Sequence, residues 1–201
     1  MADPHNIFAD QPGVELSRAW TAWREHGRAV LDLLPPATRS EARSRGLIRL
    51  FNLPNLKNLT GGDNGGSVMM TSNVEFHIND SGQLRPVAGN TMQAFRAASA
   101  AATRSKVTAL VYFDSRYNPA DNKTLARALG HELVHVADYH AGRITNFTDA
   151  CQVNISEVRA YTWDRDVSIP GLSIKGLDEI VSRTVDVFTS ARNRACVTEL
   201  R

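Results

Sequence analysis

The sequence predicts an α+β fold in which a small antiparallel sheet packs against several helices. Three observations lead to this prediction: apolar and polar residues alternate around residues 74–87, a β-branched segment covers residues 107–113, and longer segments place apolar residues at helical spacing. The chain has 201 residues, 42% of them hydrophobic, which is enough for one domain with its own core. We expect residues 1–15 to be a polar lead-in and residues 16–201 to form that single domain.

Two helices are expected in the first quarter of the domain. The segment Leu16 to Leu34 is amphipathic and is followed by two prolines, which end a helix. A second helix is expected from Arg39 to Phe51. Residues 52–67 are rich in Asn and Gly and are expected to form a loop.

The middle of the chain predicts strands as well as a helix. Val74 to Ile78 alternates in polarity, Asn79 to Gly82 has turn residues, and Gln83 to Val87 returns, which predicts a β-hairpin. The Ala-rich segment Thr91 to Thr103 is expected to be helical. Val107 to Phe113 is a strong strand candidate.

The segment Leu125 to His140 predicts one amphipathic helix. Asp121 or Asn122 can cap its start, and Gly142 occupies the place of a C-terminal cap glycine. Its apolar residues follow helical spacing and predict a buried face: Leu125, Leu129, Leu133 and Val136.

Residues 131–135 of this helix read His-Glu-Leu-Val-His. Histidines four residues apart project from one face, so His131 and His135 can reach one metal ion, while Glu132 can act on a metal-bound water. The alternative is a chance match or an ordinary surface pair, but the apolar surroundings and the caps favour a metal site. Gly130 costs about 1 kcal/mol relative to Ala inside a helix, and a close backbone approach beside His131 is one explanation.

A catalytic zinc site needs a third protein ligand and leaves the fourth position for water. The class with a third histidine in HExxHxxGxxH is excluded, because Asp138 and Ala141 occupy the positions that its glycine and last histidine would take. His140 points about 180° away from His131 on an unbroken helix. The sequence therefore favours a carboxylate from a later helix.

Glu157 is the preferred third ligand. It lies in a helix expected around residues 155–166, which Asn154 or Ser156 can cap. Ala160 and Tyr161 share its face, which indicates an inward direction. An acidic residue placed in a first helical turn for its favourable dipole interaction is the alternative.

Two other carboxylates are candidates for the third ligand. Glu179 lies in a helix expected around residues 175–196, but it shares the polar side of that helix. Asp149 ranks below both glutamates.

An HExxH helix followed some twenty residues later by a helix-borne glutamate resembles the gluzincin group of zinc metallopeptidases. The match covers Leu125 to Trp163, and Ser156 stands where thermolysin-like enzymes have Asn before the ligand Glu. In size and in residues 156–161 the chain also resembles small metallopeptidase effectors that bacteria secrete. These are type III effectors and extensions of type VI spike proteins. The resemblance implies a zincin-like fold with the motif on a central helix.

The predicted activity is hydrolysis of peptide bonds. Zn²⁺ held by His131, His135 and Glu157 would polarise the scissile carbonyl and lower the pKa of its water to near 7, with Glu132 as general base and acid. The oxyanion needs a further donor. Tyr161, Tyr139 and His140 are the candidates, and the sequence does not choose among them; of the three, we name Tyr161 as a catalytic residue. A zinc hydrolase of cell-wall peptides or other non-protein amides is a rival function. A non-enzymatic partner-binding domain with structural histidines is another.

Composition limits the partners. The net charge of +2 without a dense basic stripe argues against nucleic acid, and no apolar run reaches the ~18 to 20 residues of a membrane span. A protein or peptide substrate is expected, together with a bacterial secretion machine or a parent spike protein. The resemblance to secreted effector metallopeptidases implies a toxin or virulence effector. Because the N-terminus lacks the pattern of a secretory signal, we expect such an effector to be cytoplasmic in the producing cell and to be secreted or injected by a bacterial machine that needs no such signal.

Cys151 and Cys196 leave two interpretations open. They can form a disulfide, which would stabilise the fold by about 4 kcal/mol in an oxidising compartment, or remain two buried thiols. They lack the paired spacing of zinc ligands.

Overall fold

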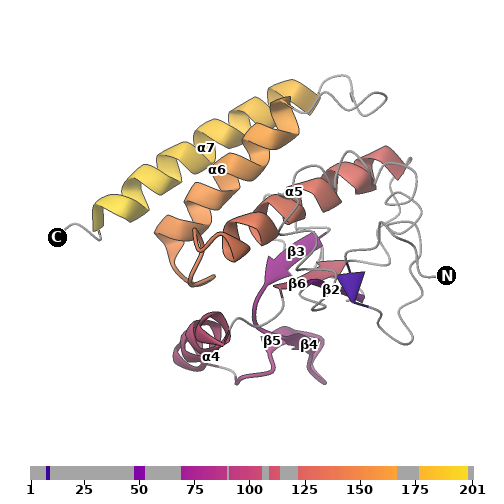
Figure 1. Ribbon diagram of the computed structural model, residues 1–201, viewed down its shortest axis with the longest axis vertical. Helices are drawn as coiled ribbons and strands as arrows, with labels where there is room; N and C mark the ends of the chain where they lie inside the picture. Colours follow the sequence, from indigo (N-terminus) through magenta and orange to yellow (C-terminus); the bar gives the residue numbers. More distant parts are fainter. Residues whose placement is uncertain are drawn as a thin grey trace.

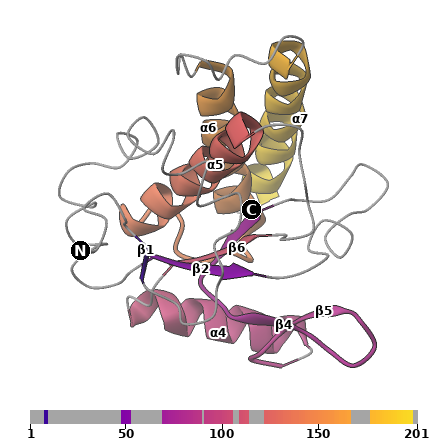
Figure 2. The ribbon, with the colours of Figure 1, turned by 90° about the vertical axis from the view of Figure 1, so that its right-hand side faces the viewer.

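The computed structural model describes residues 8–9, 48–52, 69–89, 91–105, 109–113, 122–166 and 177–198. Within these ranges a sheet forms the central layer, with one helix on one face and three helices on the other (Figures 1 and 2). The α+β class is therefore confirmed. The expected helix at residues 16–34 lies outside the described residues, and so does the expected loop at residues 52–67 except Asn52, which lies in a strand instead.

The main sheet has the strand order β1-β2-β6-β3 among the described residues. Its strands are β1 (Phe8–Ala9), β2 (Ile48–Asn52), β6 (Ala109–Phe113) and β3 (Met69–Ser72). The first three run parallel, and only β3 is antiparallel to its neighbour β6. This sheet is therefore mixed rather than antiparallel, because separate segments of the chain supply its parallel strands instead of consecutive hairpin arms.

Two expectations for the first half of the chain need correction. Residues 48–51, expected to end a helix, belong to β2, where parallel pairing with β1 on one side and β6 on the other overrides the local helical pattern. The strand β1 lies inside the expected polar lead-in, and β3 has no counterpart among the expected elements.

The expected hairpin and the helix after it are confirmed. β4 (Phe76–Ile78) pairs antiparallel with β5 (Leu84–Pro86), and this pair is the small antiparallel sheet. The helix α4 (Met92–Arg104) follows, and its N-cap residue Thr91 accepts a hydrogen bond from the Ala94 amide at 3.1 Å. In Figure 2, α4 lies below the main sheet.

The motif helix α5 (Asn122–His140) lies over the other face of the sheet (Figure 1). Leu133 and Val136 are fully buried, as the apolar stripe predicted, and Gly142 ends the helix with a φ of 72°. The side chains of Leu125 and Leu129 lie outside the described part.

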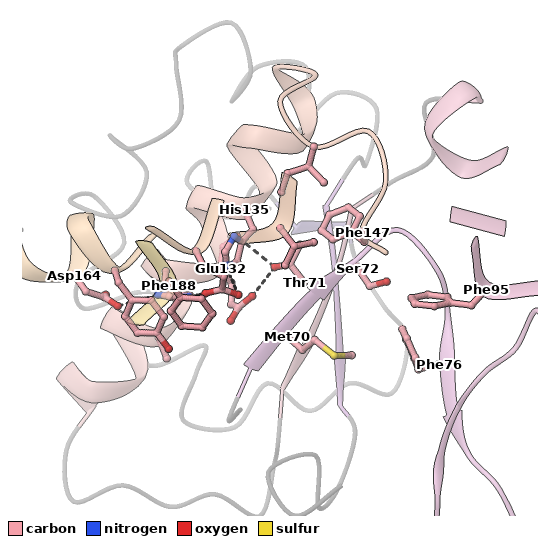
Figure 3. Close-up of a pocket in the computed structure, with 16 residues that line it drawn as sticks. Met70, Thr71, Ser72, Phe76, Phe95, Glu132, His135, Phe147, Asp164 and Phe188 are labelled. Carbon is pink, nitrogen blue, oxygen red and sulfur yellow. Dashed lines mark hydrogen bonds and ion pairs between the residues drawn. The ribbon is translucent and has the colours of Figure 1, made fainter. Parts of the chain in front are cut away.

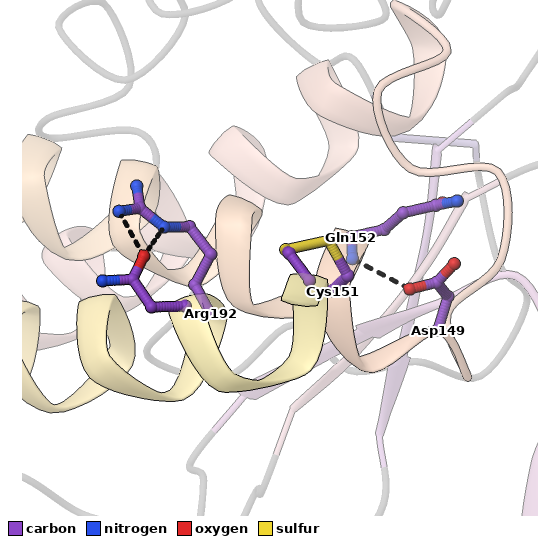
Figure 4. Close-up of a disulfide and its surroundings, with 6 residues drawn as sticks. Asp149, Cys151, Gln152 and Arg192 are labelled. Atoms are coloured by element: carbon purple, nitrogen blue, oxygen red, sulfur yellow. Dashed lines mark hydrogen bonds between the residues drawn. A yellow bond between two sulfur atoms is a disulfide. The ribbon is translucent and has the colours of Figure 1, made fainter. Parts of the chain in front are cut away.

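Beyond α5 lies a pair of helices, α6 (Ala150–Asp166) and α7 (Leu177–Thr198). The helix α6 begins earlier than expected, because Asp149 caps it by accepting a hydrogen bond from the Gln152 amide at 3.0 Å. The pair is joined by a disulfide between Cys151 and Cys196 (Figure 4). This bridge answers the question that the sequence left open, and closing a loop of that length contributes about 4 kcal/mol. No described helix has the length and hydropathy of a membrane span.

Candidate metal centre

The helices α5 and α6 bring the three predicted zinc ligands together. Nε2 of His131 lies 3.3 Å from one carboxylate oxygen of Glu157, and Nε2 of His135 lies 3.6 Å from the other. The ligand atoms of all three residues lie within 4.8 Å of one another. The group can therefore hold a metal ion.

The spacing of these atoms suits a tetrahedral ion. Zinc bonds of about 2.0 to 2.1 Å at tetrahedral angles place neighbouring ligand atoms about 3.3 to 3.4 Å apart. The observed separations of 3.3 and 3.6 Å are close to that value. These two pairs involve different oxygens of Glu157, and the ligand atoms of the whole group lie within 4.8 Å of one another, so the three side chains would draw closer together around an ion.

The other two carboxylate candidates have different positions. Asp149 is the N-cap of α6, so its carboxylate is committed to the helix amide of Gln152. Glu179 lies in the first turn of α7, and its side chain is outside the described part of the structure. Of the described residues, only Glu157 joins the two histidines in such a group.

The carboxylate of Asp164 forms a hydrogen bond with the ring nitrogen of His131 that does not face Glu157. Nδ1 of His131 lies 2.8 Å from Oδ2 of Asp164, a residue on α6 that the sequence analysis did not single out. Burial opposes charge on His131, but the hydrogen bonds to Asp164 and Glu157 outweigh it and raise the pKa of His131 to about 10. With Nδ1 bound to Asp164, the opposite nitrogen, Nε2, faces Glu157. We call His131, His135 and Glu157 together the metal group.

A hydroxyl supports His135 instead. Nδ1 of His135 lies 2.8 Å from Oγ of Ser156, and that hydroxyl donates to Oδ2 of Asp138 at 2.9 Å. Because the single hydroxyl proton goes to Asp138, Ser156 must accept from an Nδ1–H of His135. The Nε2 lone pair of His135 is then directed at Glu157. Burial lowers the pKa of His135, which favours this neutral form.

The carboxylate of Asp138, which accepts the hydrogen bond from Ser156, is fully buried and is bound by two arginines. Asp138 accepts hydrogen bonds from Nε of Arg143 at 2.7 Å and from Nε of Arg159 at 3.0 Å. Ser156, expected as a possible helix cap, therefore lies inside α6 and links the metal group to this ion cluster. A buried charge that is paired and hydrogen-bonded in this way is fixed in position.

Glu132, the predicted general base, is held on the pocket side of α5. The hydroxyl of Thr71, on strand β3, donates to Oε2 of Glu132 at 2.7 Å (Figure 3). Glu132 is 7% exposed, so it reaches solvent through the pocket rather than across an open surface. It is not one of the three residues that could hold the ion.

Tyr161 is the candidate oxyanion donor that lines the pocket. Its ring contacts His131 with centroids 4.5 Å apart and stacks on Phe188 of α7 at 5.3 Å. Burial, with a smaller effect from Glu157, raises the pKa of Tyr161, so its hydroxyl stays protonated and can donate. Tyr139 and His140, the other two candidates, are not among the residues that line this pocket.

Gly130 is explained by the helix that crosses α5. A Cβ atom at this position would overlap the indole ring of Trp163, so the close backbone approach beside His131 is real. The same helix end is tied to α5 by Arg127, which donates to the backbone carbonyl of Asp164. These contacts fix α6, and with it Glu157, against the histidines.

The metal group opens into a pocket of about 530 Å³, a size typical of ligand sites. His131, Glu132, His135, Glu157, Tyr161 and Asp164 line it, and so do three consecutive residues of strand β3: Met70, Thr71 and Ser72. No protein-family model, curated protein or solved structure matches the chain. Its function is therefore inferred from the chemistry of this site.

Proposed function

We propose that the chain is a zinc-dependent endopeptidase with a zincin-like fold. The observation that supports it most is the convergence of His131, His135 and Glu157, whose ligand atoms lie within 4.8 Å of one another. A metal-activated hydrolase also needs a base beside the metal and room for substrate. Glu132 and the pocket meet these two requirements.

Zinc bound by these three residues would polarise the scissile carbonyl and lower the pKa of water to near 7. Glu132 then accepts a proton from the attacking water and passes it to the leaving amine. Thr71 positions Glu132 by donating to its carboxylate. Tyr161 remains protonated and donates a hydrogen bond to the carbonyl oxygen as negative charge develops there.

The position of strand β3 supports a polypeptide substrate. In the described sheet β3 is an edge strand, next to β6, and its residues Met70, Thr71 and Ser72 line the pocket. An extended peptide can pair with such an edge through its backbone. A small non-protein amide would not use this edge, so the edge favours a polypeptide over such a substrate.

Delivery of the chain as a secreted bacterial effector stays a prediction. One feature supports it: the disulfide between Cys151 and Cys196 is of a kind that persists in oxidising compartments and is rare in the cytosol.

The proposal is tested by replacing Glu132 with Ala in the zinc-loaded protein. Hydrolysis of unfolded casein should fall by at least about a hundredfold, the contribution expected of a general base, while zinc content stays unchanged. The matched control is Glu75→Ala, at an exposed glutamate on the edge of the hairpin. If Glu132→Ala cleaves casein as fast as the wild type, Glu132 is not the base. If the zinc-loaded wild type cleaves neither casein nor purified peptidoglycan, the hydrolase proposal is wrong.

A further inference from the structure

The pocket extends well beyond the metal group into a region where none of the described lining residues carries a charge. We call this region the apolar end. Its residues come from β3, β4, α4, α6 and the connection after α5: Met70, Phe76, Phe95, Ile144, Phe147 and Val153. Figure 3 shows Phe76 and Phe95 at the opposite side of the pocket from Asp164, with Met70, Ser72 and Phe147 between them.

The apolar end is preformed by ring packing. Phe76 makes edge-to-face contacts with Phe95 at 5.6 Å and with Tyr112 at 5.8 Å. Phe147 packs on Tyr139 at 5.4 Å. Each of these contacts joins different segments of the chain, so the rings are held in place without a ligand.

The rings of the apolar end are nevertheless incompletely covered. Phe76, Phe95 and Phe147 are each only partly buried, unlike Tyr112 and Leu133 in the core. Apolar surface that faces a pocket gains free energy when a ligand displaces the water next to it. A charged side chain would lose hydration here without finding a partner among the described residues that line this end.

The metal end of the same pocket has the opposite character. Its charged residues are Glu132, Glu157 and Asp164, which surround the two histidines. A substrate that spans the pocket therefore meets a polar, reactive end and an apolar, binding end. Because the pocket follows β3, an extended chain can occupy both ends at once.

We infer that the apolar end is a specificity subsite that accepts one large apolar side chain, aromatic or branched aliphatic, of the polypeptide cleaved at the metal group. This inference rests on the proposed endopeptidase function. It names the substrate class: unfolded or extended segments with such a residue at one fixed position from the scissile bond.

The first test is a cleavage profile. The zinc-loaded wild type is incubated with peptides from a digested proteome, and the cleaved bonds are identified by mass spectrometry. We expect Phe, Tyr, Leu, Ile or Met to be enriched at a single position relative to the cut. A flat profile, or enrichment of charged or small residues only, would overturn the inference and leave the peptidase function intact.

The second test compares two variants of one helix. Phe95→Ala removes a ring of the apolar end, whereas Met92→Ala changes a residue of α4 that is 59% exposed and does not line the pocket. Phe95→Ala should reduce the preference for a Phe-containing over an Ala-containing peptide by about tenfold. Met92→Ala should leave that preference unchanged. Equal preferences in both variants would contradict the subsite.

A binding measurement separates failure of the subsite from failure of the enzyme. Glu132→Ala protein is titrated with tetrapeptides that differ only in carrying Phe, Ala or Asp at the selected position, with all positions scanned if no cleavage is found. The Phe peptide should bind about tenfold more tightly than the Ala peptide, and adding Phe95→Ala should remove the difference. Equal affinities would refute the subsite, whatever the cleavage assay shows. If Glu132→Ala binds the Phe peptide selectively but the zinc-loaded wild type cleaves no peptide, the subsite is retained and the peptidase function is rejected.

Discussion

The two metal-facing histidines, one helical turn apart, are supported in different ways. Behind His131 lies a carboxylate, that of Asp164, whereas behind His135 lies the hydroxyl of Ser156, which relays to Asp138. The pKa of His131 is raised to about 10. Burial lowers the pKa of His135. At neutral pH and without metal, His131 is therefore a positively charged imidazolium, whereas His135 is neutral.

Burial disfavours charge on both rings, but the hydrogen bonds from His131 to Asp164 and Glu157 outweigh it, whereas burial prevails at His135. An anion in direct contact stabilises the protonated ring. Once the proton on Nε2 is lost, the same anion makes that nitrogen a stronger electron-pair donor to a metal. A hydroxyl fixes the orientation and the tautomer but adds no charge of its own. The metal group thus combines His131, a strongly basic ligand that must lose a proton before it binds metal, with His135, which is already neutral.

Replacement of Asp164 should have the largest effect on metal affinity. Asp164→Asn keeps the shape and an acceptor oxygen but removes the charge, so zinc affinity, corrected for the proton that zinc displaces from His131, should fall by about 100-fold, the upper end of the range for such partners. Competition with a chelator of known affinity measures it. Asp80→Asn, in the exposed hairpin turn, is the control. Unchanged affinity in Asp164→Asn would show that the carboxylate does not support His131.

The proton on His131 should make zinc binding depend on pH. Zinc must displace this proton, so its affinity should rise about tenfold per pH unit above neutrality until the pKa of His131 is reached. Zinc titrations at pH 7.0, 7.5 and 8.0 test this, and Asp164→Asn should flatten the slope. A wild-type affinity that is constant over this range would be inconsistent with a raised pKa.

The stability of the metal-free protein should change in the opposite direction. The pKa of His131 rises from 6.5 to about 10 on folding. Its stabilising contribution is therefore complete below pH 6.5 and is lost as the pH rises through about 10. Urea unfolding of the metal-free protein at pH 7 and pH 9 measures this loss, which Asp164→Asn should diminish.

Replacement of Ser156 should reduce zinc affinity less than replacement of Asp164. Ser156→Ala removes the relay between His135 and Asp138, and zinc affinity should fall by about tenfold, the lower end of the range. Ser99→Ala is the control, since Ser99 is equally buried and donates to Asn73 outside the metal group. If Ser156→Ala costs more than Asp164→Asn, the proposed difference between the two supports is wrong.

The pattern of the local sequence predicted much of the candidate site. The helical spacing of residues 131–135 placed both histidines on one face, and the small and aromatic neighbours of Glu157 indicated its inward direction. Asp164 was missed although the same signal pointed to it. It lies seven residues after Glu157, two helical turns along the face that Tyr161 also occupies.

Other parts of the site depend on contacts that have no local signal. Thr71 meets Glu132 across 61 residues of sequence, and its strand β3 pairs with the distant β6. The parallel pairing of β2 likewise depends on partners far along the chain. Such contacts are specified by the packed fold and not by the periodicity of a short segment.

Zinc content per chain is the most direct test of the metal group. Wild-type protein and the variants His131→Ala, His135→Ala, Glu157→Gln and Glu179→Gln are loaded with excess zinc, separated from free metal by gel filtration and analysed by atomic emission. Wild type and Glu179→Gln should retain one ion per chain, and the other three should lose most of it. A wild type that retains no zinc, or a Glu157→Gln protein that retains as much as the wild type, would contradict this ligand set.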